Sequence, residues 1–195
     1  MITEHSTRRR AELLEAIVDV MLEEGVADLS LRPLAERVGS SARLLIYHFD
    51  SKESLIAAAL ERVRGRIADA LHAYAQEQPS TPSLRTALTR FWRWATAEPN
   101  QPYFRLLFEI DGLAMYGRLR VSPDAWKDGA AVWQALVRRA DAASGEAVAA
   151  APGRTVLIWT SIAALLQDFL ATGDDERTEE AFEYLLNLLE RGGVG

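Results

Sequence analysis

The chain has 195 residues, 49% of them hydrophobic, and its 28 acidic and 22 basic side chains give a formal net charge of −6. This length accommodates one or two small domains with a hydrophobic core. Because the chain has no cysteine, a disulfide scaffold, a zinc finger, an iron–sulfur centre and a thiol nucleophile are excluded, and a cytoplasmic location is expected. The acidity argues against a polycation that coats nucleic acid or anionic membranes without regard to sequence.

Neither a secretory leader nor a membrane span is expected. The N-terminal residues lead into an amphipathic pattern and not into the uniform apolar run of a signal peptide. The most apolar segment, residues 156–166, is shorter than the roughly 18 residues that cross a bilayer. We therefore predict a soluble protein without a membrane partner.

Apolar residues recur at helical spacing along nearly the whole chain, which predicts an all-α fold of about nine helices. The first helix is expected to end at Gly25, where glycine can take the left-handed conformation. Ser30 and Ser51 are placed to cap the helices that follow them. Further helices are expected at residues 31–38, 42–49, 52–78, 83–97, 103–115, 124–143, 154–171 and 177–191.

Residues 31–49 have the pattern of a helix-turn-helix. Two short helices that cross steeply need a small residue at the crossing, a glycine in the turn and apolar residues between them. Ala35, Gly39, Leu34, Val38 and Leu45 occupy these places. The second helix would present its outward face to the major groove of DNA. The alternative is a tight helix pair inside an all-α bundle of another function.

Several short motifs surround this segment at fixed spacing: Glu-Glu-Gly25, Leu29-Ser-Leu-Arg32, Leu34-Ala-Glu-Arg-Val-Gly39, Tyr47-His-Phe49 and Ser51-Lys-Glu-Ser-Leu55. Together they resemble the TetR family of one-component transcriptional regulators. The resemblance implies a helix-turn-helix domain in residues 1–51 and an effector-binding, dimerising helical bundle in residues 52–195. It further implies a homodimer on a palindromic double-stranded DNA operator, from which a small-molecule effector releases the protein.

The resemblance and the outward face of the second helix assign DNA contacts to Ser30, Arg32, Ser41, Ala42, Arg43, Leu44, Ile46, Tyr47, His48 and Lys52. Leu44 stands where threonine is frequent in the family, and Ile46 stands where a tyrosine usually lies. Arg43 is the only arginine or lysine of the second helix, and arginine paired with guanine is the commonest specific base contact. It could equally meet a phosphate or pair with Asp50 or Glu53. His48 could equally be a packing residue.

Charge is distributed unevenly along the chain. Residues 29–52 carry four basic and two acidic side chains, and Arg8, Arg9 and Arg10 precede them. Most of the net negative charge falls after residue 66. We therefore expect a locally basic DNA-binding region in an otherwise acidic protein. This distribution of charge suppresses non-specific binding to DNA.

All five tryptophans lie beyond residue 82. Aromatic residues at helical spacing usually form core, but the resemblance implies an effector pocket in this half of the chain. The candidate wall residues are Phe91, Trp92, Phe104, Phe108, Asp111, Met115, Trp126, Trp133 and Trp159. Asp111 either caps or pairs near its helix end or meets a cationic or hydroxylated effector. Gln167, Thr160 and Glu109 are weaker candidates.

The last two expected helices are apolar on more than one side, which predicts that they bury one face in their own subunit and one in a partner. A larger monomeric core is the alternative. The expected interface residues are Val156, Ala163, Gln167, Leu170, Tyr184, Leu185, Leu188 and Leu189.

Two other functions are alternatives to a transcriptional regulator. An all-α enzyme is disfavoured because the sequence has no metal-ligand spacing, nucleophile elbow, phosphate loop or paired carboxylates on a recognisable face, so neither a metal nor a cofactor is expected. A ligand-independent DNA-binding scaffold is the other rival, and a fully packed C-terminal domain would favour it.

Overall fold

The computed structural model describes residues 2–76, 83–119 and 152–191, and these ranges contain helices and turns but no strand. The elements are α1 (Ile2–Glu24), α2 (Leu31–Arg37), α3 (Ala42–Phe49), α4 (Lys52–Gln76), α5 (Leu84–Thr96), the 3-10 turn η1 (Glu98–Asn100), α6 (Gln101–Met115), α8 (Pro152–Thr172) and α9 (Asp175–Arg191). The expected all-α fold is confirmed, and the expected helix ends agree to within two residues. The helix expected at 124–143 lies outside the described residues.

The chain divides into two compact units. The described part of the first comprises residues 2–70 and 102–119, and that of the second comprises 71–76, 83–101 and 152–191. Helix α4 contributes to both units, since its residues 52–70 belong to the first and 71–76 to the second, and the domain boundary expected after residue 51 stays a prediction.

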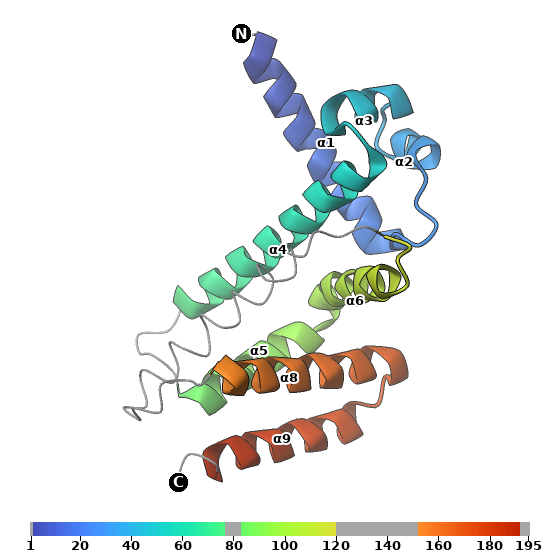
Figure 1. Cartoon of the computed structure of the whole chain (residues 1–195). Coiled ribbons are helices and arrows are strands. Elements are labelled where there is room, and N and C mark those ends of the chain that lie inside the picture. Colours follow the sequence, from blue (N-terminus) through green and yellow to red (C-terminus); the bar gives the residue numbers. More distant parts are fainter. Residues whose placement is uncertain (1, 77–82, 120–151, 192–195) are drawn as a thin grey trace. The chain divides into compact units, whose positions relative to one another are not determined.

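The first unit holds the N-terminal helices, with α1, α2 and α3 gathered near the N-terminus (Figure 1). Helix α1 buries Ile17, Val18 and Met21, whereas Leu14 and Leu22 are only partly buried. The core is completed from the other helices by Leu34, Ala35, Leu45, Phe49, Leu55, Ile56, Ala59 and Leu60. Each large side chain in such a core contributes about 1.5–3 kcal/mol of hydrophobic stabilisation.

A cluster of ion pairs joins α1 to α4. Arg66 donates hydrogen bonds to Glu15 at 2.5 Å and to Asp19 at 2.7 Å, and Arg62 also bonds Glu15. The hydrogen bond from Arg66 holds the pKa of Glu15 below its ordinary value, against the opposing effect of partial burial. These contacts hold α4 against α1.

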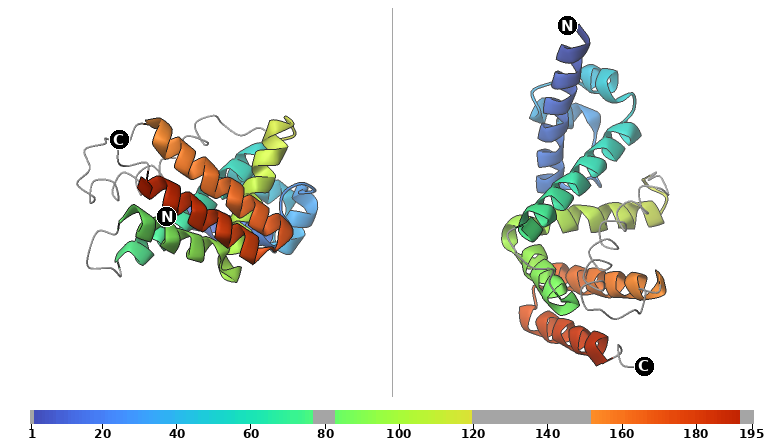
Figure 2. Two further views of the ribbon diagram at one scale, coloured as in Figure 1. Left: turned by 90° about the horizontal axis from the view of Figure 1, so that it is seen from below. Right: turned by 90° about the vertical axis from the view of Figure 1, so that its left-hand side faces the viewer.

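In the second unit α5, α8 and α9 pack together, and α8 and α9 lie side by side (Figure 2). The indole of Trp92 stacks on Phe182 with ring centres 4.7 Å apart and meets Phe169 edge-on at 6.4 Å. Arg85 of α5 donates to Glu183 and Glu190 of α9 at 2.8 and 2.7 Å. These contacts hold the middle and the last turn of α9 against α5.

Helices α8 and α9 retain a second apolar face. Ile158, Ile162 and Leu166 of α8 are buried, as are Phe182 and Leu186 of α9. Large apolar side chains also remain exposed on these helices, namely Val156, Leu157, Tyr184 and Leu188. By length and composition alone, residues 153–172 of α8 would suffice to cross a membrane, although only 22% of that stretch is buried inside the chain.

Candidate nucleic-acid interface and effector pocket

The turn between α2 and α3 has the geometry that the sequence predicts. Gly39 adopts a positive φ of 62°, which favours glycine, and the next amide, of Ser40, donates to the Ala35 carbonyl at 2.8 Å. Leu34, Ala35 and Leu45 are buried where the two helices meet. The small side chain of Ala35 therefore permits the close crossing of a helix-turn-helix.

Helix α3 begins at a serine cap and has one buried face. The Ser41 hydroxyl accepts a hydrogen bond from the Leu44 amide at 3.2 Å, which satisfies a free donor of the first turn. Leu45 and Phe49 point inward, and 71% of the Tyr47 side chain is exposed. An aromatic residue so exposed on a short helix offers a contact surface that the fold itself does not use.

Arg43 is exposed and makes no hydrogen bond or ion pair with any residue that the structure describes. The possible pairing with Asp50 or Glu53 is therefore not formed. Arg32, in contrast, pairs with Glu36 on α2 at 3.3 Å, and both side chains are highly exposed. An exposed pair of this kind contributes little to stability.

Of the two helix caps that the sequence predicts beside α2 and α3, one forms and one does not. Ser30 occupies the N-cap position of α2 in extended backbone, but its hydroxyl forms no capping bond, so the expected cap is wrong. The cap expected at Ser51 is confirmed, since its hydroxyl accepts from the Ser54 amide at 3.0 Å. The ammonium group of Lys52 donates to the Leu29 carbonyl and so ties the start of α4 to the segment before α2.

The N-terminal arginines are engaged within the first unit. Arg8 and Arg9 pair with Glu12 at 2.9 and 3.5 Å, and Arg10 donates to the His48 carbonyl at 3.1 Å. His48 is partly buried, with its ring edge-on to Tyr47 at 5.1 Å. The charge of the N-terminal arginines is thus partly balanced locally. Arg43 remains as the free cation on the exposed face of α3.

Glu109 of α6 takes a role that the sequence did not suggest. Its carboxylate oxygens accept hydrogen bonds from the Val26 amide at 3.0 Å and the Ala27 amide at 2.7 Å. Gly25 has a φ of +76°, and a Cβ at this position would overlap the Glu109 carboxylate. By sequence alone, Glu109 is a weaker candidate for an effector contact. In the structure it holds the turn between α1 and α2 instead.

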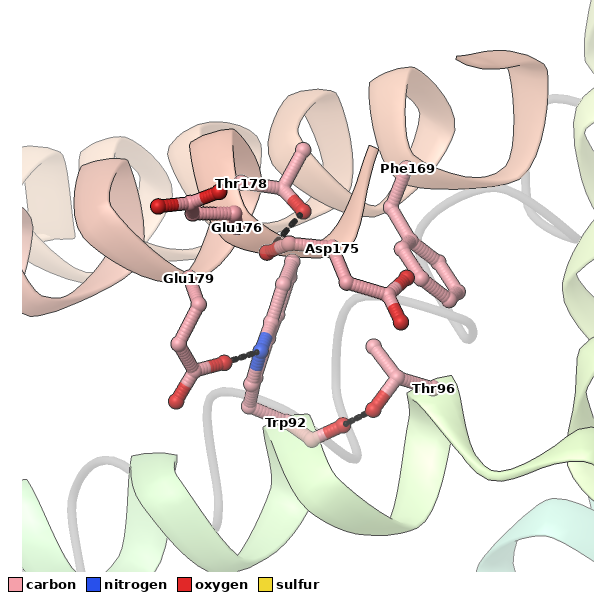
Figure 3. A pocket seen from close by; sticks show the side chains of 7 residues that line it. All are labelled: Trp92, Thr96, Phe169, Asp175, Glu176, Thr178 and Glu179. Carbon is pink, nitrogen blue, oxygen red and sulfur yellow. Dashed lines mark hydrogen bonds between the residues drawn. The ribbon is translucent and has the colours of Figure 1, made fainter. Parts of the chain in front are cut away.

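A pocket of about 440 Å³ lies in the second unit, between α5 and the α8–α9 turn (Figure 3). It is lined by Trp92, Thr96, Phe169, Asp175, Glu176, Thr178 and Glu179. The Trp92 indole N–H donates to Glu179 at 2.7 Å, whereas Asp175 and Glu176 form no side-chain ion pair within the described residues. Two aromatic side chains beside three carboxylates suit a ligand that is positively charged or rich in hydrogen-bond donors.

The candidate wall residues are not gathered around this pocket. Trp92 lines it, while Phe91 and Trp159 belong to the same unit without lining it. The candidates on α6 belong to the first unit: Phe104 is buried, Phe108 is partly buried, and Met115 is 80% exposed. Trp126 and Trp133 lie outside the described residues.

Asp111, also on α6, sits in a different environment from the carboxylates of the pocket. Burial raises its pKa to about 6, and the positive charge of Arg64 partly opposes this shift. This carboxyl group therefore titrates much closer to neutral pH than an ordinary aspartate.

Sequence reasoning missed most of the lining of the pocket. Phe169 and Asp175 come from either side of the turn at Gly173, and Glu179 follows one helical turn after Asp175. The acidic run after Gly173 was a usable signal, because three carboxylates there begin or precede a helix. No group of three His, Cys, Asp or Glu side chains suited to a metal ion occurs in the described ranges.

None of the expected interface residues is buried within the single chain. Val156, Gln167, Tyr184 and Leu188 are exposed, and the other four are partly buried: Ala163, Leu170, Leu185 and Leu189. They therefore remain available to a partner.

Helices α1, α2 and α3 form a small bundle in which the outer face of α3 is exposed. This arrangement is that of a helix-turn-helix DNA-binding protein. The family model of bacterial regulatory proteins, tetR family, matches residues 13–59, which cover the second half of α1, all of α2 and α3, and the start of α4. Over these residues the chain is similar to the TetR family. The HTH-type transcriptional regulator BetI 1 of Chromohalobacter salexigens is 29% identical over 63 residues. That match spans 32% of this chain and 31% of the relative, about a third of each.

The similarity to solved structures extends over nearly the whole chain. A TetR transcription regulator from Haloarcula marismortui matches with a TM-score of 0.69 at 19% identity, covering 91% of this chain and 94% of that one. NalD of Pseudomonas aeruginosa, described as the secondary repressor of the MexAB-OprM multidrug efflux pump, matches with a TM-score of 0.55 at 18% identity. That match covers 98% of this chain and 97% of NalD. At these identities the likeness establishes a shared fold.

Proposed function

We propose that the protein is a sequence-specific transcriptional regulator that binds a palindromic operator as a homodimer. The observation that carries this proposal is the exposed face of α3, where Arg43 has no partner in the described residues and Tyr47 projects outward. Arg43 reads a guanine through its O6 and N7 atoms, and Ile46 contacts a thymine methyl group or a sugar. Tyr47 and the uncommitted hydroxyl of Ser30 bind the DNA backbone.

The dimer forms through the second apolar face of α8 and α9. Val156, Tyr184 and Leu188 are about half exposed or more in the single chain, which is costly for large apolar side chains on neighbouring helices. A two-fold partner buries them and presents two α3 helices to half-sites one helical turn, or a multiple of it, apart. The match of residues 13–59 to the TetR family model supports a regulator rather than an enzyme, and such a protein acts in the cytoplasm.

The regulator acts as a repressor that a small molecule releases from DNA. The pocket beside Trp92 supports this proposal, because its volume is within the usual range for ligand sites and it is not filled by side chains. Its three carboxylates favour a cationic effector. Such a ligand shifts the protein away from the operator-binding arrangement only if it binds the other arrangement more tightly.

Selection from random duplex DNA by the purified protein tests the central proposal. We expect enrichment of an inverted repeat, and Arg43→Ala to lose discrimination at one base pair of each half-site. Arg37→Ala is the matched control, because it removes the same charge from the same region while Arg37 is already paired with Glu23 and Glu24. Recovery of sequences without any common motif would overturn the proposal.

A thermal-shift comparison of cationic, neutral and anionic amphiphiles tests the pocket. We expect cationic compounds to stabilise the protein, and Asp175→Asn to reduce that stabilisation. Glu180→Gln removes the same charge from α9 at a residue that does not line the pocket. Equal responses to all three classes of compound would contradict the proposed effector chemistry and favour a ligand-independent DNA-binding protein.

A further inference from the structure

Glu109 connects two parts of the first unit that are far apart in sequence. It lies on α6, and its carboxylate accepts from the consecutive amides of Val26 and Ala27 at 3.0 and 2.7 Å. These contacts span 83 and 82 residues. Hydrogen bonds to an ionised acceptor are roughly twice as strong as neutral ones, and two oxygens on adjacent amides also fix an orientation.

The end of α1 is built to receive this carboxylate. Gly25 closes the helix with a φ of +76°, and its own amide donates to the Met21 carbonyl at 2.9 Å. The amides of Val26 and Ala27 follow directly, and Glu109 takes both. Because Gly25 has no Cβ, the carboxylate can approach the chain at a position that any other side chain would obstruct.

The same turn leads into the helix-turn-helix and is held at a second point. The Leu29 amide donates to the Val26 carbonyl at 3.1 Å, and the Leu29 carbonyl accepts from Lys52 of α4. Helix α2 begins two residues later, at Leu31. The segment before α2 is thus tied to α6 by Glu109 and to α4 by Lys52.

We infer that Glu109 is a positioning residue for operator binding. Its carboxylate holds the α1–α2 turn on α6, so that helices α2 and α3 keep one orientation relative to the rest of the first unit. Without this contact α2 and α3 sample several orientations, and the apparent Kd rises in inverse proportion to the fraction of molecules that keep the binding-competent one. The inference rests on the proposed function as a DNA-binding regulator.

The direction in which the Kd changes when Glu109 is replaced distinguishes a positioning role from an electrostatic one. Replacing Glu109 by a neutral residue makes an acidic protein less negative, and this change alone strengthens attraction to DNA. Loss of positioning has the opposite effect. Glu61 on α4 is the matched control, because it is exposed and forms no hydrogen bond or ion pair with any described residue.

The experiment measures the Kd for the selected operator by fluorescence anisotropy in the full-length wild type, Glu109→Ala, Glu109→Gln and Glu61→Ala. We expect Glu109→Ala to raise the Kd by about tenfold, the equivalent of one net charge-assisted hydrogen bond. Glu109→Gln, which keeps one acceptor oxygen, should raise it less, and Glu61→Ala should not raise it. Far-ultraviolet circular dichroism identifies any variant that fails to fold. If Glu109→Ala does not fold, Glu109→Gln is compared with Glu61→Ala in its place.

Amide hydrogen exchange supplies a second readout that does not need DNA. In Glu109→Ala the amides of Val26 and Ala27 should exchange faster, while the Leu45 amide inside α3 should keep its wild-type rate. A folded Glu109→Ala protein that binds the operator as tightly as Glu61→Ala would overturn the inference. If the wild type selects no operator, the proposed function fails together with this role, whereas unchanged exchange at Val26 and Ala27 would disprove the contact alone.

Discussion

Arg10 of α1 donates a hydrogen bond from Nε to the carbonyl oxygen of His48, in the last turn of α3, at 3.1 Å. Its guanidinium group also lies over the Phe49 ring, 4.9 Å from the ring centre. A positive charge beside the C-terminal carbonyls of a helix is favourable because the helix dipole is negative there. Arg10 therefore supports the C-terminal end of α3.

This relationship predicts a loss of stability when Arg10 is truncated. Arg10→Ala removes a charged hydrogen bond and a cation–π contact, so the free energy of unfolding should fall by about 1–2 kcal/mol in urea titrations. Arg8→Ala is the control, because Arg8 makes only an exposed pair with Glu12, which contributes little to stability. Equal losses in the two variants would show that the contact with His48 contributes nothing.

The two serines that precede α2 and α3 should respond differently to alanine. Ser41→Ala removes a capping bond to the Leu44 amide and should lower the free energy of unfolding by about 1 kcal/mol. Ser30→Ala removes a hydroxyl that caps nothing and should leave stability unchanged while weakening operator binding. Thermal melts and anisotropy on the same pair of variants measure both effects. A destabilised Ser30→Ala would show that this hydroxyl has a structural partner after all.

The exposed face of α8 and α9 predicts a dimer that a single charge can disrupt. Leu188→Glu places a carboxylate among apolar side chains of the proposed interface, and we expect a monomer in sedimentation equilibrium at micromolar concentration. Operator affinity should fall with it, since one half-site is then bound at a time. Asn187→Asp adds the same charge on the same helix but keeps the acceptor for Arg85, so it should remain dimeric. A dimeric Leu188→Glu would place the interface elsewhere.

The sequence predicted those features that depend on local patterns. Apolar spacing located the helices, and Ala35 with Gly39 located the crossing of α2 and α3, because both depend on residues close in the chain. The partners of Glu109 were not predictable, since nothing near it in sequence indicates that α6 meets the end of α1. The lining of the pocket was equally hidden, because α5 and α9 bring Trp92 and Glu179 together across 87 residues.

The cap expected at Ser30 failed for a different reason. Serine before a helix is a reliable signal of where the helix starts, and α2 does start at Leu31. The side-chain bond itself depends on a rotamer, which the surroundings decide. A local pattern thus predicts a helix boundary better than it predicts which hydrogen bonds form there.

Asp111 predicts an unusual dependence of stability on pH. Burial raises its folded-state pKa to about 6, above the 3.8 of an exposed aspartate, so between these values the folded state binds more protons than the unfolded state. Its cost to stability is absent below about pH 4, grows as pH rises through the folded pKa, and is complete above about pH 7. Asp111→Asn should therefore be more stable than wild type by about 1–3 kcal/mol at pH 7.5, and the difference should nearly vanish at pH 4. Urea titrations of both proteins at the two pH values, at one protein concentration, measure this. A difference that stays constant with pH would mean that Asp111 keeps an ordinary pKa, as it would if Arg64 compensated fully for its burial.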